Sequence, residues 1–255
     1  MFSSNFWSDL VLTLVFLIGP FLIYLWCKRL PVPFDKDRVA ILNTNYALFN
    51  TLYAVFLGMA LVSLLNTFYA SKDATNREAE SVLLAYRLSL GLHLSPELPF
   101  AIQEYAKNIR DLEFPAMAEG HMSPGAQQSL DTVWRLTLHA TPMDRTEEAL
   151  HRALLSELSE ISKQRLTRSV KLSENLHPSV VFIIYFGYLL MLAKFWHTRI
   201  DWPGHQLMNE CIVVGLFMAA VVIILDLKTP FSGIVNVDVE PFAQVLDRMR
   251  TIVGH

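Results

Sequence analysis

Four apolar stretches, each long enough to cross a lipid bilayer, divide this chain of 255 residues. They cover residues 10–27, 46–65, 179–196 and 211–227. A helix rises about 1.5 Å per residue, so about 18 residues span about 27 Å, which is close to the thickness of the hydrocarbon layer. We therefore expect an all-α membrane protein with four transmembrane helices.

The composition agrees with a membrane protein and argues against several other classes. Hydrophobic residues make up 53% of the chain and charged residues 18%, whereas charged residues average about 25% in soluble domains. The net charge of −3 gives no basic character for binding nucleic acid. Cys27 and Cys211 both lie in apolar stretches, so neither a disulfide framework nor a zinc site is expected. Because Met1–Asp9 contains no Lys or Arg, residues 10–27 should be a retained span and not a signal peptide.

A charged segment between the second and third stretches predicts a helical bundle outside the membrane. Helix starts at Ser95-Pro96, Ser123-Pro124 and Asp144, with Glu147 three residues after Asp144, predict helices over residues 96–119, 123–140 and 144–175. His177-Pro178 predicts a break before the third span. We therefore expect four regions: spans one and two in 1–69, the inserted bundle in 70–177, spans three and four in 178–228, and a tail in 229–255 with a short helix near 241–252.

The side on which the bundle lies stays open. Four spans place the N-terminus, the bundle and the C-terminus on one side of the membrane. Basic residues in the short loop 28–38 would put that loop in the cytoplasm. However, Arg165, Arg168 and Lys171 are expected near the membrane on the opposite side, and long domains weaken the positive-inside rule.

The second apolar stretch is unusually polar for a helix in lipid. One helix face, with steps of three, four or seven residues, contains the following side chains: Asn43, Tyr46, Asn50, Tyr53, Leu57 and Leu64. An unpaired amide in hydrocarbon costs several kcal/mol, so this face must meet another helix or water. Both interpretations remain open: hydrogen bonding within a bundle, or a water-lined pathway.

No catalytic or cofactor motif is present, so we expect neither an enzyme nor a bound cofactor or metal. The sequence contains no P-loop, H-E-x-x-H, C-x-x-C or G-x-S-x-G pattern. Asp226, at the end of the fourth apolar stretch, is an ionisable group in an apolar helix, which points to an ion pair or an ion pathway. Arg77 is a second candidate for either role.

Several short motifs resemble the bacterial bestrophin-like family, a group of membrane proteins with a domain of unknown function. The resemblance covers nearly the whole chain. It rests on the polar second stretch and on the following segments: Asn66–Ala70, Asp73–Ala79, Leu84–Arg87, Glu104-Tyr105, Pro115–Met117, Leu225-Asp226, Pro230-Phe231-x-Gly233 and Glu240–Phe242.

Kinship with bestrophins implies a pentameric anion channel, in which the second transmembrane helix of each subunit lines an axial pore with an apolar neck. The neck would then lie near Tyr53, Phe56, Leu57 and Ala60. The complete implied pore lining is Asn43, Tyr46, Asn50, Tyr53, Phe56, Leu57, Ala60 and Leu64. Only Asp238 and Glu240 follow the Pro-Phe-x-Gly motif, whereas Ca²⁺ takes six or more oxygen ligands, so calcium gating is not expected.

Two functional hypotheses follow. The first is a homo-oligomeric channel for chloride or similar anions, multi-pass in a bacterial inner membrane and in contact with its lipid. The second is a non-conducting membrane scaffold or sensor, in which the helical bundle binds a partner and the polar face of the second span only joins helices.

Overall fold

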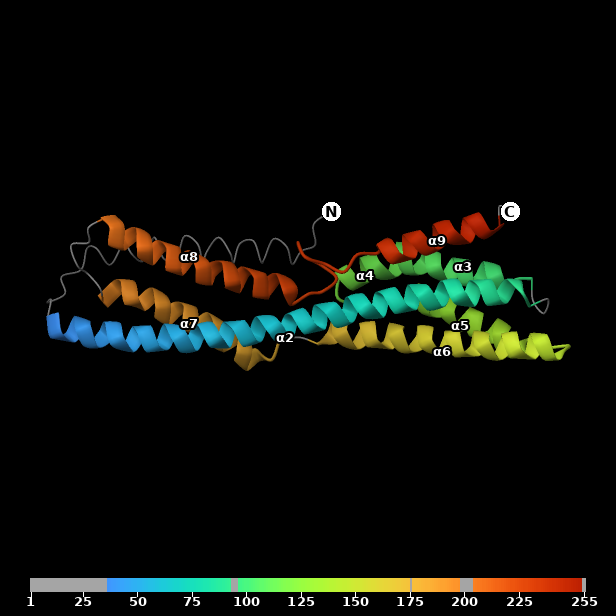
Figure 1. Ribbon diagram of the computed structural model, residues 1–255, viewed down its shortest axis with the longest axis horizontal. Helices are drawn as coiled ribbons and strands as arrows, with labels where there is room; N and C mark the ends of the chain where they lie inside the picture. Colours follow the sequence, from blue (N-terminus) through green and yellow to red (C-terminus); the bar gives the residue numbers. More distant parts are fainter. Residues whose placement is uncertain (1–35, 93–95, 175, 198–203, 254–255) are drawn as a thin grey trace. The chain divides into compact units, whose positions relative to one another are not determined.

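The computed structural model describes residues 36–92, 96–174, 176–197 and 204–253, without the side chains of 36–40, 42–43, 192–197, 204–211 and 253. The described residues form helices and no strand, which confirms the all-α prediction (Figure 1). The first apolar stretch, 10–27, lies outside the described residues. The helices are α2 (Lys36–Leu90), α3 (Leu98–Asn108), the π-helix η1 (Ile109–Glu113), α4 (Phe114–Ala118), α5 (Pro124–His139), α6 (Arg145–Ser173), α7 (Pro178–His197), α8 (Gly204–Leu227) and α9 (Glu240–Val253).

One helix in the described part of the chain is long and apolar enough to cross a membrane. It is the segment Thr44–Leu90 of α2. The third and fourth apolar stretches form α7 and α8, whose described apolar segments, Pro178–Met191 and Ile212–Leu227, are shorter. The topology of four spans therefore stays a prediction.

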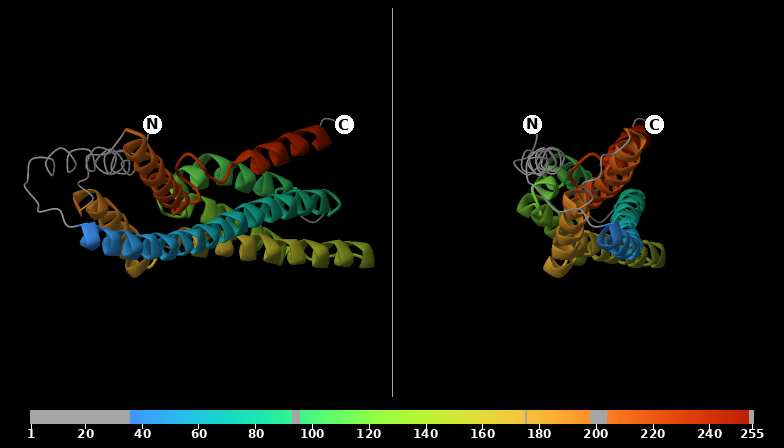
Figure 2. Two further views of the ribbon diagram at one scale, coloured as in Figure 1. Left: turned by 60° about the vertical axis from the view of Figure 1, so that its left-hand side comes forward. Right: turned by 90° about the vertical axis from the view of Figure 1, so that its left-hand side faces the viewer.

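Helix α2 has 55 residues and continues without a break, as both views in Figure 2 also show. Its sequence contains no proline and a single glycine, Gly58. Backbone hydrogen bonds can therefore continue through its whole length, because neither a missing N–H group nor a proline ring interrupts them. The helix begins at Lys36, inside the segment 28–38 that was expected to be a loop.

The chain forms two compact units. The first unit combines the described residues of Met1–Asn66 with Leu176–Lys228, and the second combines Thr67–Asn175 with Thr229–His255. Helix α2 contributes to both. In the second unit, α3, α5, α6 and α9 lie along the C-terminal part of α2 (Figure 1). The tail thus shares one core with the central helical segment.

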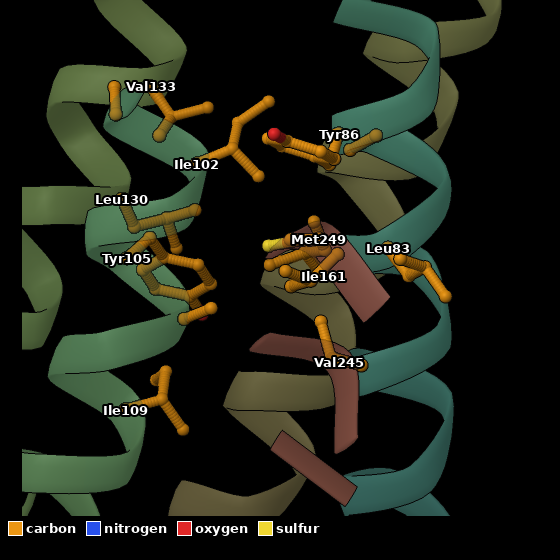
Figure 3. Close-up of a cluster of buried hydrophobic side chains, with 14 of the residues drawn as sticks. Leu83, Tyr86, Ile102, Tyr105, Ile109, Leu130, Val133, Ile161, Val245 and Met249 are labelled. Atoms are coloured by element: carbon orange, nitrogen blue, oxygen red, sulfur yellow. The ribbon is translucent and has the colours of Figure 1, made fainter. Parts of the chain in front are cut away.

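That core is built from large apolar side chains of α2, α3, η1, α5, α6 and α9 (Figure 3). Ile102, Ile109 and Leu130, from α3, η1 and α5, face Ile161 of α6 and Met249 of α9. All five are less than 5% exposed. Burying a side chain of this size stabilises a fold by about 1.5–3 kcal/mol relative to leaving it in water, so this cluster is the main source of stability in the second unit.

The expected helix 96–119 is not uniform, which corrects the sequence prediction. It consists of α3, one turn of π-helix, and α4. The backbone N–H of Phe114 bonds the carbonyl of Ile109, five residues earlier. Pro115 explains this, because it has no N–H to donate and its ring would crowd the carbonyl of Asp111 in a regular α-helix. The wider turn places the Glu113 side chain in the interior, where it is fully buried.

The start of α6 agrees with the predicted cap at Asp144. The Asp144 carboxylate accepts a hydrogen bond from the backbone N–H of Glu147, at 2.8 Å, and the Glu147 carboxylate accepts one from the N–H of Met143. Helix α6 ends at Ser173 and α7 begins at Pro178, so the break expected at His177-Pro178 is confirmed.

Replacing this cap should weaken α6 without unfolding the protein. We expect Asp144→Ala to lower the free energy of unfolding by about 1 kcal/mol, because the N–H of Glu147 loses its acceptor. Asp144→Ser, which keeps a capping oxygen, should stay within about 0.5 kcal/mol of the wild type. Chemical unfolding of the detergent-solubilised protein measures both. Equal losses in the two variants would contradict the role of the cap.

Candidate functional site

Helix α2 has two different faces within the first unit. One face is packed against the neighbouring helices: Tyr53, Leu57, Ala60 and Leu64 are all less than 9% exposed. These are four of the residues predicted to line a pore. Of the others, Tyr46, Asn50 and Phe56 are half-buried, and the side chain of Asn43 lies outside the described residues.

Tyr53 is the best-defined contact of the packed face. Its hydroxyl donates a 2.6 Å hydrogen bond to the backbone carbonyl of Ile184 on α7. Its ring stacks on Phe49 of α2 and on Phe217 of α8, with centroid distances of 5.7 and 5.6 Å. The ring also lies directly against the backbone of Gly187. One aromatic side chain therefore joins three helices.

Asn50 lies one turn before Tyr53 and has a feature that needs an explanation. Its amide oxygen is buried, and within the described part of the chain it has no hydrogen-bond partner. Buried polar atoms in native proteins are almost always paired with protein or water. A partner from outside the single protomer, either water or a second copy, would satisfy this atom.

The opposite face of α2 is uncovered in the protomer. Five apolar side chains of this face, each at least 57% exposed, follow one another along the helix: Leu48, Leu52, Val55, Met59 and Val62. Exposed hydroxyl and amide groups accompany them, namely Thr44, Asn45, Thr51, Ser63 and Asn66. Among the side chains that the structure describes on α7 and α8, the large exposed ones are apolar, for example Phe182 and Leu216.

The other two candidates have ordinary surroundings. Arg77 is exposed and pairs with Asp73, one turn earlier on α2, at 2.8 Å. Asp226 is half-buried near the end of α8 and takes part in an interaction. In the described part of the chain, no group of three or more His, Cys, Asp or Glu side chains is arranged to hold a metal ion.

The second unit contains a buried ionic cluster, which we define as Glu78, Glu113, Arg165 and Arg168. Arg168 bonds both carboxylate oxygens of Glu78, from Nε at 2.7 Å and from Nη2 at 2.9 Å, and Nη2 also reaches Glu113 at 3.1 Å. Arg165 bonds both oxygens of Glu113, from Nε at 3.1 Å and from Nη2 at 2.6 Å. Two bidentate Arg–Glu ion pairs therefore connect α2, η1 and α6.

The surroundings of this cluster satisfy its remaining polar atoms. The hydroxyl of Tyr105 on α3 donates to Glu78 at 2.6 Å. The Arg168 guanidinium lies 5.7 Å from the ring centroid of Phe114, within the range of a cation–π contact. The two arginines balance the two glutamates, so the interior carries no net charge at this point.

Burial and charge act in opposite directions on Arg168. Burial alone would lower its pKa, but the negative charges of Glu78 and Glu113 outweigh burial and raise the pKa above its usual value. For Tyr105, burial raises the pKa well above 10, and the neighbouring Glu78 raises it further. Arg168 thus remains a cation and Tyr105 a neutral hydrogen-bond donor at any ordinary pH.

The ionic cluster was not predicted from the sequence. Arg165 and Arg168 had been interpreted only as basic residues near the membrane. A signal did exist on α2, where Glu78 shares a helix face with Ala74, Val82 and Ala85, all of which are buried. A carboxylate in the middle of an apolar face is a recognisable sign of a buried partner of opposite charge.

Comparisons with known proteins agree with this fold. A structure of a bacterial bestrophin homolog from Klebsiella pneumoniae, with one substitution, has a TM-score of 0.69 at 10% identity, over 99% of this chain and 100% of that one. A second structure of a homolog from the same organism gives 0.67 at 10% identity, over 97% and 98%. A variant described as a membrane protein gives 0.70 at 10% identity, over 97% and 98%. These similarities establish the fold.

A search of curated proteins found no match. The family comparison is decisive. The model of the Bestrophin-like domain matches residues 14–242, which is most of the chain. The chain therefore belongs to the Bestrophin-like domain family.

Proposed function

We propose that this protein is a homo-oligomeric ion channel of a bacterial inner membrane, that it conducts small anions such as chloride, and that α2 lines its pore. Membership of the Bestrophin-like family makes a channel the first function to consider. Five copies around one axis would correspond to the bestrophin architecture. No step of this proposal needs a cofactor or a catalytic group.

The observation that carries the proposal is the uncovered face of α2. It combines exposed hydroxyl and amide groups with apolar side chains inside a segment that is apolar enough to cross a membrane. The Thr51 hydroxyl already donates to the backbone carbonyl of Ala47. The exposed amides of Asn45 and Asn66 would cost free energy in hydrocarbon, unless water or another subunit meets them. The described exposed side chains of Val181–Met191 on α7 and of Ile212–Leu227 on α8 are apolar and have no such conflict with lipid. We therefore assign the uncovered face of α2 to a hydrated axis.

This assignment gives the predicted pore residues two different roles. Tyr53, Leu57, Ala60 and Leu64 would form the layer behind the pore, where they attach α2 to the rest of its own subunit. Asn50, at the border between the two faces, would complete its hydrogen bonds in the assembly. The surface facing the ions would consist of Thr44, Thr51, Leu52, Val55, Met59, Val62 and Asn66.

The chemistry of this lining suits weakly selective passage of anions. Residues 41–66 contain no charged side chain, so ions would meet only dipoles. The amide N–H groups of exposed side chains such as Asn66 can donate hydrogen bonds to an anion. Between these polar ends, Leu52, Val55 and Met59 would form an apolar constriction, which can close a pore by losing its water.

Planar bilayer recordings test the proposal. The purified protein should pass chloride and nitrate currents, and Val55→Thr should increase the unitary conductance. Thr has the shape of Val and adds a hydroxyl that can hold water in the constriction. A barrier lower by about 1.4 kcal/mol would raise the current about tenfold. Ile223→Thr, a similar change on the exposed face of α8, should leave conductance unchanged.

Mass photometry on the same preparation measures the number of subunits, so that a missing current can be separated from a missing oligomer. A ring-shaped oligomer with conductance that responds to Val55 and not to Ile223 supports the proposal. An intact oligomer that passes no current in the bilayer would contradict the channel proposal and favour the scaffold hypothesis. A functional channel in which both variants behave like the wild type would reject α2 as the pore lining.

A further inference from the structure

A cavity of about 500 Å³, broadly open to solvent, lies in the second unit beside the buried ionic cluster. Residues of the α5 region and of α6 line it, among them Gln127, Asp131, Trp134 and Arg165. Its volume falls in the range of small-molecule sites, and it combines an apolar wall with a few polar groups, as such sites commonly do. We propose that this cavity binds a zwitterionic α-amino acid with a large apolar side chain.

Arg165 supplies the group that would bind the carboxylate of the ligand. The residue is only 8% exposed and lines the cavity. Its Nε and Nη2 are held by Glu113, and Nη2 also donates to the backbone carbonyl of Ser123. Its remaining nitrogen, Nη1, donates to the side-chain oxygen of Gln127. The guanidinium is therefore fixed by the fold, while the partner of Nη1 is an exposed and replaceable side chain.

Gln127 shows which chemistry fits next to Arg165. Its carboxamide oxygen accepts from the guanidinium, and its carboxamide nitrogen donates to the Asp131 carboxylate at 2.8 Å. A neutral amide thus lies between the remaining N–H of a guanidinium already paired with Glu113 and the carboxylate of Asp131. An α-amino acid places a carboxylate and an ammonium group on neighbouring atoms, so it can make the same two contacts with full charges at both ends. Charge-assisted hydrogen bonds are about twice as strong as neutral ones.

The rest of the cavity suits an apolar side chain. Met122, Leu130, Trp134 and Leu166 line it. The Trp134 ring is fixed, because its Nε1–H donates to the hydroxyl of Ser162 on α6 at 3.0 Å. An aliphatic or aromatic side chain would contact this ring and cover Leu166, which is 64% exposed. A ligand without an apolar side chain would leave this wall in water.

Simpler ligands fit these groups less well. A plain carboxylate would bind Arg165 but would leave Asp131 beside it with no cation. An amine would pair with Asp131 and would place a positive charge next to the arginine. Only a ligand with both charges replaces both hydrogen bonds of Gln127. This inference concerns the second unit and is independent of the proposed channel.

Isothermal titration calorimetry of the full chain in detergent with L-phenylalanine tests the proposal. We expect saturable binding of one molecule per subunit. 3-Phenylpropionate lacks the ammonium group and 2-phenylethylamine lacks the carboxylate, so each should bind at least about tenfold more weakly, the effect of losing one charged hydrogen bond. An absence of binding by L-phenylalanine, or equal binding by 3-phenylpropionate, would overturn the proposal.

Variants of Gln127 and Asp131, the two exposed polar residues of the cavity, distinguish binding at this site from unspecific binding. Asp131→Asn should weaken L-phenylalanine binding about tenfold, while Asp247→Asn on α9 should not change it. Gln127→Ala should tighten binding, because it removes the side chain that competes for Arg165, and Gln128→Ala should have no effect. Weaker binding by Gln127→Ala, at an unchanged melting temperature, would overturn the assignment of Gln127 as an occupant of the site.

Discussion

Arg168→Ala should lower the free energy of unfolding of the second unit by about 3–5 kcal/mol, the usual effect of removing one partner from a buried ion pair. The variant loses two bonds to Glu78 and one to Glu113, and it leaves both carboxylates fully buried with only Arg165 to balance them. Taking these charges out of water was tolerable only because Arg168 was present. Urea or thermal unfolding in detergent, followed by circular dichroism, measures the loss.

Arg77→Ala is a matched control, because it removes an arginine from an exposed ion pair at the position next to Glu78. The 2.8 Å ion pair of Arg77 with Asp73 is about as short as the contacts in the cluster, which measure 2.6–3.1 Å, but both side chains are about 60% exposed. We expect a change within about 0.5 kcal/mol, because water screens such a pair. A loss below about 1 kcal/mol for Arg168→Ala would contradict the role of the cluster.

The double variant Glu78→Leu with Arg168→Met distinguishes the ion pair from simple packing. It removes both charges of this ion pair and keeps much of the apolar volume, so it should be more stable than Arg168→Ala alone. Glu113 retains Arg165 as its partner in this variant. If the double variant were less stable than Arg168→Ala, the unpaired charge of Glu78 could not explain the stability that Arg168→Ala loses.

Local signals in the sequence predicted local structure well. The cap at Asp144 and the break at His177-Pro178 act through neighbours only a few residues away, so their effect could be inferred without a fold. The boundaries of α6, Arg145–Ser173, lie within two residues of the expected 144–175. The π-turn Ile109–Glu113 leaves no trace in the apolar periodicity, since it arises from the effect of Pro115 on the turn before it.

Contacts between distant segments could not be predicted in the same way. Glu78 meets Arg168 across 90 residues, and Tyr53 meets Ile184 across 131. Helical spacing correctly placed Tyr53 and Leu57 on one face of α2, but periodicity does not tell which face meets its own subunit. The structure supplies that information through burial, and it is the reason why the proposed lining lies on the opposite face.

Gly187→Ala should lower the stability of the first unit, although Ala is the better helix former. A Cβ atom at this position would lie less than 3.0 Å from three ring atoms of Tyr53. The ring cannot move away easily, because its hydroxyl is bonded to Ile184 and its faces stack on Phe49 and Phe217. Overpacking of this kind costs about 1–3 kcal/mol. Thermal unfolding in detergent or nanodiscs measures it.

Gly215→Ala on α8 is the control, because it shows how a Gly→Ala substitution changes stability when the new methyl group meets no neighbour. A Cβ atom there meets nothing within 4 Å, so only the backbone effect remains, and the variant should be up to about 1 kcal/mol more stable. The same substitution in two apolar helices should thus have opposite results. Tyr53→Leu in the Gly187→Ala background should recover part of the loss, because the smaller side chain makes room for the new methyl group. If Gly187→Ala behaved like Gly215→Ala, or if Tyr53→Leu gave no recovery, the close contact of α2 with α7 would not hold this part of the fold together. The division of α2 into a packed face and an uncovered face would then lose its main support.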